Sequence, residues 1–368
     1  MKITQIEIFA SPIKLKEAFI ISLSRHDYAE NIIVRITTNE GLTGFGECCP
    51  FKSINGESME SGVIVGKYLA QNLVHKNPLN LEECSAIMDA TIFGNSSIKS
   101  AFDIALYDIA AQHAQLPLYA FLGGKNNKTI TTDYTISIDT PTKMAADAQK
   151  IAANGFQFIK VKLGASKSDD IERIKKIREA VGDKIPLRID ANQGWKADEA
   201  VDILNALSTY NIQHCEEPIA RWNFMELPRI KKESKIEIMA DESCCDHNDA
   251  KRLIDLNACH QINVKLGKSS GLFKALKIIQ LAEKAKLKMQ LGGFLESRLA
   301  FTASAHLALC SANIVHFDFD SPLMLQEDVV LDGIQYNSKG EIAMPNKIGL
   351  GASVDEKYLV KLKKIVVQ

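Results

Sequence analysis

The sequence predicts an α/β fold in which a (β/α)8 TIM-type barrel carries an α+β capping domain, built from the N-terminal part and the C-terminal tail. Three observations support it. In the first 50 or so residues apolar and polar residues alternate, as in antiparallel strands. In residues 62–120 the apolar residues recur with the period of a helix. After residue 129, eight short apolar runs follow, each succeeded by an amphipathic helical stretch, and from the second run on their ends lie 24 to 30 residues apart. One strand, one helix and two short loops need about that length, so the repeat favours a barrel.

The composition limits the possible functions. Of the 368 residues, 46% are hydrophobic and 24% charged, with a formal net charge of −1, which is typical of a globular protein and argues against nucleic-acid or membrane-surface partners. No apolar run approaches the ~18 to 20 residues of a membrane span. The N-terminus alternates like a strand and lacks the apolar centre of a signal peptide, so we expect a cytoplasmic protein.

The capping domain is predicted over residues 1–124. The segments 3–10 and 31–47 alternate apolar and polar residues, with a turn at 39–41, and residues 97–115 place their apolar side chains on one helical stripe. Pro117 and the pair Gly123-Gly124 then end the helical pattern.

The barrel is predicted over residues 125–325, and residues 326–368, which alternate again, are expected to rejoin the capping domain. The eight apolar runs are 131–138, 156–164, 185–193, 212–218, 236–243, 261–268, 287–293 and 314–320. The active site of such a barrel lies at the carboxyl ends of its strands.

Three acids end consecutive predicted strands, namely Asp190, Glu216 and Asp241. Any one of them is most simply a solvated loop start, but three together without His or Cys partners are hard oxygen ligands that suit Mg²⁺. Glu217 and Glu242 directly follow two of them, and we expect these neighbours to orient the ligands instead of binding metal.

Lysines flank these acids from opposite sides of the predicted ring. Lys160 and Lys162 end strand two, and Lys265 ends strand six. One amine on each face of a carbon is what a racemase or epimerase needs, since one lysine removes a proton and the other returns it on the far side. The alternative is that the lysines are only salt-bridge partners for the acids.

The motifs KVKLG (160–164), RIDANQGW (188–195), EEP (216–218), ADES (240–243) and NVKLGKSSG (263–271) resemble the enolase superfamily in its muconate-lactonising-enzyme subgroup. Segment 104–124 resembles the capping-domain boundary of that superfamily. The resemblance spans essentially the whole chain. It implies that Lys162 and Lys265 are the acid/base pair, that Lys160 lies beside the substrate carboxylate, and that Asp190, Glu216 and Asp241 hold one Mg²⁺ per subunit.

Within the subgroup, the Asp-x-Asp of Asp318 and Asp320 resembles the dipeptide epimerase signature, in which carboxylates hold the substrate's α-ammonium. Thr135 and the run Gly293-Phe294-Leu295 match other substrate-contacting positions of that family. Epimerases for Ala-Glu carry an arginine where this chain has Ser24, with Arg25 one position on.

The resemblance therefore implies a dipeptide epimerase for small or apolar dipeptides such as Ala-Ala, from cell-wall peptide turnover. We also expect a homo-oligomer. Two other readings stay open. An N-acylamino acid racemase or o-succinylbenzoate synthase would use the same lysines and metal without needing the Asp-x-Asp, and a non-catalytic barrel would only bind a ligand.

Overall fold

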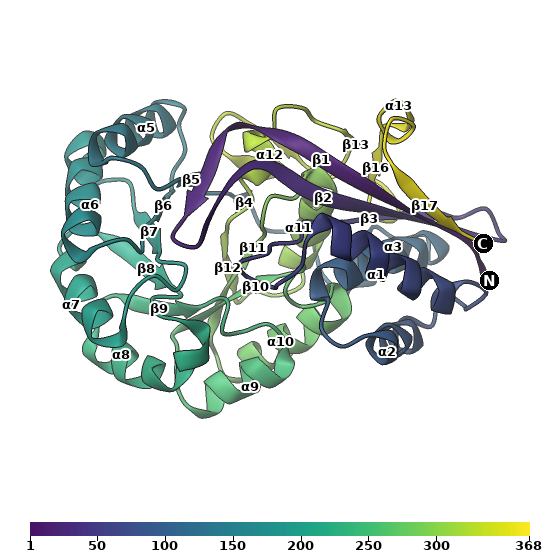
Figure 1. Cartoon of the computed structure of the whole chain (residues 1–368), viewed down its shortest axis with the longest axis horizontal. Coiled ribbons are helices and arrows are strands. Elements are labelled where there is room, and N and C mark those ends of the chain that lie inside the picture. The colour runs from purple at the N-terminus through teal and green to yellow at the C-terminus, as the bar shows by residue number, and fades with distance from the viewer.

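The computed structural model describes residues 1–368 and has the fold class predicted from the sequence: a parallel eight-stranded barrel sheet beside a separate antiparallel sheet with its own helices (Figure 1). The antiparallel sheet has the strand order β17-β1-β2-β3, with β1 at Ile3–Ile21, β2 at Ser24–Thr38, β3 at Thr43–Cys48 and β17 at Lys364–Val367. Helices α1 (Met59–Leu73), α2 (Leu81–Thr91), α3 (Ser96–His113) and α4 (Leu118–Phe121) follow in the chain. None of the helices combines the length and the apolar composition that a membrane span requires.

The barrel strands run in the order β5 to β12 and are all parallel. They are β5 (Tyr134–Ile136), β6 (Ile159–Lys162), β7 (Leu187–Asp190), β8 (Ile212–Glu216), β9 (Glu237–Ala240), β10 (Gln261–Lys265), β11 (Lys288–Gly292) and β12 (Ile314–Phe317). The helices of the barrel are α5 (Pro141–Ala153), α6 (Lys167–Val181), α7 (Ala197–Leu207), α8 (Leu227–Glu233), α9 (His247–Asp255), α10 (Leu272–Lys284), α11 (Arg298–Ala308) and α12 (Ser321–Met324), with a 3₁₀ turn η1 (Arg221–Glu226) before α8.

The C-terminal tail divides between the two parts of the molecule. β17 pairs with β1, while β15 (Glu341–Ala343) pairs with β14 (Gln335–Tyr336) and with β4 (Ile130–Thr131). Strand β13 (Val330–Asp332) pairs with β16 (Ala352–Val354), and α13 (Glu356–Leu359) precedes β17. The domain boundaries at 124 and 325 stay a prediction.

The first predicted barrel strand is shorter than expected. Only Tyr134–Ile136 of the run 131–138 lies in the barrel sheet, because the residues before it bond to the end of the eighth strand instead. The Asp133 N–H donates to the Phe317 carbonyl (3.2 Å), and the Phe319 N–H donates to Thr132 Oγ1 (2.8 Å). The regular ladder of hydrogen bonds between the barrel strands ends at β5 on one side and at β12 on the other. The two bonds from Asp133 and Phe319 join these end strands and so close the ring.

Buried carboxylates attach the first sheet and its helices to the barrel. Glu47, at the end of β3, accepts hydrogen bonds from the backbone of Ser297 (3.0 Å) and Ala300 (3.1 Å) at the start of α11. Asp103 of α3 accepts from Leu272 N (2.5 Å) at the start of α10. A carboxylate at a helix N-terminus satisfies free N–H groups and complements the helix dipole. Gly271 is required there, since a Cβ would lie 2.3 Å from the Asp103 carboxylate.

The β1–β2 hairpin reaches over the carboxyl ends of the barrel strands. Ile20 at its tip accepts a hydrogen bond from the Ile138 N–H (3.0 Å), and Ser22 Oγ donates to the Asn192 carbonyl (2.7 Å). The register of the hairpin shifts between Lys14 and Phe19, so the strand bends at that point. The hairpin tip therefore covers the mouth of the barrel.

Candidate active site

Three carboxylates converge at the mouth of the barrel from three adjacent strands. Asp190 ends β7, Glu216 ends β8 and Asp241 directly follows β9, and one oxygen from each lies within 4.8 Å of the others. All three are fully buried. The carboxyl ends of parallel strands share one edge of a sheet, which explains why acids so far apart in the chain meet here. A buried set of oxygen ligands of this kind fits Mg²⁺ in donor type and in charge.

Lysine ammonium groups surround these carboxylates. Lys162 lies 2.6 Å from Asp190, and Lys265 lies 2.8 Å from Asp241. Lys160 is fully buried and contacts Glu216 (2.9 Å) as well as Asp190 (3.4 Å). Because unpaired buried charges are costly, this alternation of signs is what allows so many ionisable groups at one place.

The surrounding carboxylates govern the ionisation of Lys160 and Lys265. Burial alone would lower both pKa values, but the neighbouring carboxylates outweigh burial and raise them, those of Asp318 and Glu216 for Lys160 and those of Asp241 and Glu216 for Lys265. The pKa of Glu216 changes in the opposite direction. Burial alone would raise it, but the Lys160 ammonium holds it well below the usual range of a glutamate.

Glu217 and Glu242 are not part of the group of three converging carboxylates but bond to residues around it. Glu217 accepts from the Asp241 N–H (2.7 Å) and from Ser243 Oγ (3.0 Å), and Glu242 accepts from the Asn192 amide (3.1 Å). Burial, together with the nearby acids, raises the pKa of Glu217 to about 8 and that of Glu242 to about 7. Each therefore orients a neighbour of the site, as the sequence analysis expected for the second member of each pair.

A cavity opens above these groups, between the barrel mouth and the hairpin tip. Lys162 and Lys265 both line it, and each ammonium also lies over an aromatic ring: Lys162 is 5.7 Å from the centre of Phe19, and Lys265 is 5.1 Å from that of Phe294. The remaining lining residues are Ile21, Phe51, Ile54, Thr135, Asn192, Gly293, Asp318, Asp320, Ser321 and Met324. The cavity thus has charged groups at its base and an apolar lid.

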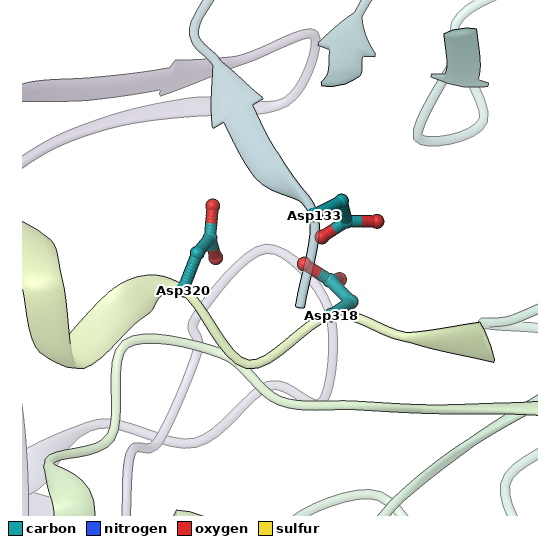
Figure 2. A group of neighbouring side chains, drawn as sticks. All are labelled: Asp133, Asp318 and Asp320. Carbon is teal, nitrogen blue, oxygen red and sulfur yellow. The ribbon is translucent and has the colours of Figure 1, made fainter. Parts of the chain in front are cut away.

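A second group of carboxylates lies at one side of this cavity, where β12 meets β5. Asp318 and Asp320 follow β12, and Asp133 precedes β5; one oxygen of each lies within 4.8 Å of the others. In Figure 2 the Asp318 carboxyl lies next to that of Asp133, and the Asp320 carboxyl lies apart to the left. Asp320 accepts from the Thr135 N–H (2.5 Å), and Asp318 pairs with Lys160 (2.8 Å).

Two of the predicted substrate-contacting residues do not line the cavity. Leu295 is buried and accepts a hydrogen bond from Asn31 through its carbonyl (3.2 Å). Lys160 lies below the cavity floor, because its ammonium is held among the carboxylates. Thr135, Gly293, Phe294, Asp318 and Asp320 all line the cavity.

Sequence reasoning missed several residues of the site. Lys268, fully buried, donates to the Asp241 carboxylate, and Glu216 accepts from Gln290 (2.6 Å) and Asn263 (3.2 Å). Asn263 lies two residues before Lys265 and Gln290 two before Gly292, so strand alternation was a usable signal for both. Lys268 lies in the turn after β10, where no periodicity indicates its direction.

Comparisons with known proteins identify the family of the chain. Residues 3–123 match the N-terminal domain of mandelate racemase and muconate lactonizing enzyme, and residues 143–358 match the enolase C-terminal domain-like family. The chain is 57% identical to the D-Ala-D/L-Ala epimerase of Cytophaga hutchinsonii, with 100% of both chains covered. It is 40% identical to the hydrophobic dipeptide epimerase of Enterococcus faecalis, over 96% of this chain and all of the relative.

Among solved structures, the dipeptide epimerase of Cytophaga hutchinsonii complexed with Mg and D-Ala-L-Val superposes with a TM-score of 0.99, at 57% identity and full coverage of both chains. Both domain matches and the fold thus agree with the resemblance read from the motifs. The chain belongs to the mandelate racemase and muconate lactonizing enzyme family of the enolase superfamily.

Proposed function

We propose that this protein is a Mg²⁺-dependent dipeptide epimerase, an isomerase that inverts the α-carbon of the C-terminal residue of a dipeptide by two-base 1,1-proton transfer. The observation that carries the proposal is one cavity lined by Lys162 and Lys265 together with Asp318 and Asp320. The two lysines can act as bases, and the two aspartates match the free amine that a dipeptide has and an N-acylated amino acid lacks. Similarity to the two epimerases supports the same reaction class.

Asp190, Glu216 and Asp241 would hold the metal. When bound, Mg²⁺ would supply a Lewis acid that stabilises the negative charge developing on the substrate carboxylate. The set formed by Asp190, Glu216 and Asp241 supports one Mg²⁺ per subunit, since the other group of carboxylates, at Asp318 and Asp320, is assigned to the substrate amine.

The two lysines then divide the proton transfer. One lysine takes the α-proton as the neutral amine and becomes an ammonium, which leaves a planar substrate anion. For Lys265 the neutral form requires that bound Mg²⁺ offset the Asp241 and Glu216 carboxylates, which otherwise raise its pKa. The ammonium of the other lysine returns a proton to the opposite face of that carbon, and its configuration is inverted. The reverse reaction exchanges the two roles, so both lysines are needed in each direction. Phe19 and Phe294, which lie against these ammonium groups, keep water from the reacting carbon.

The apolar lid supports small or apolar dipeptides, of the Ala-Ala kind, as substrates. Phe19, Ile21, Phe51 and Ile54 line the cavity, and no arginine does. Arg25 instead pairs with Asp27 (2.9 Å), and its side chain is 60% exposed. A role in cell-wall peptide turnover, a cytoplasmic location and a homo-oligomeric state stay predictions from the sequence.

The test compares Ala-Ala, Ala-Glu and N-acetyl-Ala-Ala in deuterated buffer with Mg²⁺, followed by mass gain at the α-carbon. We expect Ala-Ala to exchange fastest and N-acetylation to abolish exchange. Preference for the N-acetylated compound would instead identify an N-acylamino acid racemase. A lack of exchange with any of the three compounds would argue for a barrel that binds ligands without catalysis.

A further inference from the structure

Asp133 is a buried carboxylate that the reaction outlined above leaves without a role. It lies just before β5, directly beside the two aspartates proposed to bind the substrate amine, and one of its oxygens is within 4.8 Å of an oxygen of each. Figure 2 shows its carboxyl turned toward that of Asp318. Burial and the neighbouring Asp318 carboxylate raise the pKa of Asp133, and they raise that of Asp320 to about 7, so three acids gathered in one buried place need an explanation.

Each of the three carboxylates has one oxygen bound by the protein. Arg188 pairs with Asp133 Oδ2 (2.8 Å), Lys160 pairs with Asp318 Oδ2 (2.8 Å), and the Thr135 N–H donates to Asp320 Oδ2 (2.5 Å). The second oxygen of Asp133, Oδ1, is buried and has no hydrogen-bond partner. A buried acceptor without a donor is uncommon in folded proteins, because it loses its bond to water and gains nothing in return.

A primary ammonium group matches this set in geometry and in charge. It has three N–H donors in a tetrahedral arrangement, and acceptors at about 2.8 Å from its nitrogen lie about 4.6 Å from one another. One oxygen each of Asp133, Asp318 and Asp320 lies within 4.8 Å of the others, which is compatible with that spacing. Arg188 pairs with Asp133, but the Lys160 ammonium is shared among Asp318, Glu216 and Asp190. The three carboxylates therefore have less positive charge around them than negative charge, and a bound ammonium would reduce that deficit.

We propose that Asp133 supplies the third acceptor for the substrate's α-ammonium, beside Asp318 and Asp320. This assignment rests on the proposed function, since it requires a substrate with a free amine. Asp133 does not line the open cavity and is fully buried, so the nitrogen sits between Asp318 and Asp320 with its third N–H directed inward. The subsite thereby selects a primary amine over an N-alkylated one, because each methyl group removes one donor.

A purely structural role for Asp133 is the competing explanation. Its N–H and its carboxylate both join the first strand to its neighbours, through Phe317 (3.2 Å) and Arg188 (2.8 Å). Loss of that bridge would loosen the barrel and reduce activity toward every substrate alike. The two explanations therefore differ in how the Asp133 variant responds to methylation of the substrate nitrogen.

The experiment measures KM and kcat for Ala-Ala and for N-methyl-Ala-Ala with the Mg²⁺-loaded wild type and with Asp133→Asn. The asparagine oxygen stays on the Arg188 guanidinium, so its NH₂ group faces the substrate and accepts nothing. We expect KM for Ala-Ala to rise about ten- to a hundredfold with little change in kcat. N-methylation should raise KM about tenfold or more in the wild type and less than threefold in the variant.

Two further variants provide controls. Asp103→Asn removes a buried carboxylate at the start of α10, away from the cavity, and should leave both KM values unchanged. If Asp133→Asn does not fold, Asp133→Leu combined with Arg188→Met takes its place. This double variant removes the buried pair without leaving a charge unpaired, and it should show the same small effect of N-methylation on KM.

The outcomes are distinguishable. An equal methylation effect in the wild type and in both Asp133 variants would overturn the assignment of Asp133 and leave the proposed function standing. A wild type that exchanges the α-proton of no dipeptide would overturn the proposed function, and the ammonium subsite with it.

Discussion

Ser24→Arg should shift the substrate preference toward dipeptides with an acidic C-terminal residue, such as Ala-Glu. Ser24 is paired with Ile21 across the hairpin tip, and residues directly opposite in an antiparallel pair share a face. Ile21 lines the cavity. Ser24 Oγ also lies 3.0 Å from Ser53 Oγ, next to the lid residue Ile54. An arginine at position 24 therefore points toward the bound C-terminal side chain.

The size of the effect follows from one new charge-assisted hydrogen bond. Such a bond is worth about 1.5 to 3 kcal/mol, and each 1.4 kcal/mol corresponds to a factor of about ten. The ratio of kcat/KM for Ala-Glu to that for Ala-Ala should therefore rise about ten- to a hundredfold. Most of the change should appear in KM, because the side-chain carboxylate takes no part in the proton transfer.

The assay compares the two dipeptides in wild type, Ser24→Arg, Ser24→Met and Arg25→Ala. Ser24→Met adds length without charge and separates steric from electrostatic effects. Arg25 pairs with Ile20 on the other face of the hairpin and is bound to Asp27, so Arg25→Ala should leave the ratio unchanged.

Two results would refute this reasoning. If the wild type already prefers Ala-Glu and Arg25→Ala removes that preference, Arg25 reaches the substrate and the assignment of hairpin faces is wrong. If Ser24→Arg leaves the ratio as it was while Ala-Ala is still turned over, position 24 does not face the second residue of the dipeptide.

Three other predictions concern the bases, the metal and stability. Lys162→Ala and Lys265→Ala should each abolish epimerisation while allowing solvent exchange of the α-proton from one face; full epimerase activity in either would exclude the two-base mechanism. Chelation should remove activity, and Asp241→Asn should weaken Mg²⁺ binding in calorimetry; activity that survives chelation would contradict the ligand assignment. His306 is buried between the Tyr119 N–H (3.1 Å) and a backbone carbonyl, and burial lowers its pKa to about 4. Only the unfolded state then binds this proton between pH 6.5 and 4, so the free energy of unfolding should fall by up to about 3 kcal/mol as the pH drops through that range. Denaturant unfolding at several pH values, with His306→Gln as the reference, would measure this loss of free energy. Identical pH profiles of the wild type and His306→Gln would contradict the role of His306.

The sequence alone was sufficient for the barrel and for much of the candidate site. Its repeat of about 25 residues reflects a local unit, one strand and one helix, so periodicity alone reveals it. Asp190, Glu216 and Asp241 lie at or directly after strand ends, and parallel strands bring those ends to one edge whatever their distance along the chain. The convergence of these acids with Lys162 and Lys265 therefore followed from the order of the elements.

Only the tertiary structure decided which of these side chains reach the cavity and which lie beneath it. Lys160 and Lys162 look equivalent in the sequence, yet only Lys162 lines the cavity, because Asp318 and Glu216 hold the Lys160 ammonium below the floor. Asp133 has no signal of its own in the polar first half of the apolar run 131–138. Its neighbours come from β7 and from the end of β12, about 55 and 185 residues away in the chain, through Arg188 and Asp318. Contacts of this kind depend on how the ring of strands closes, and no local pattern along the chain records that closure.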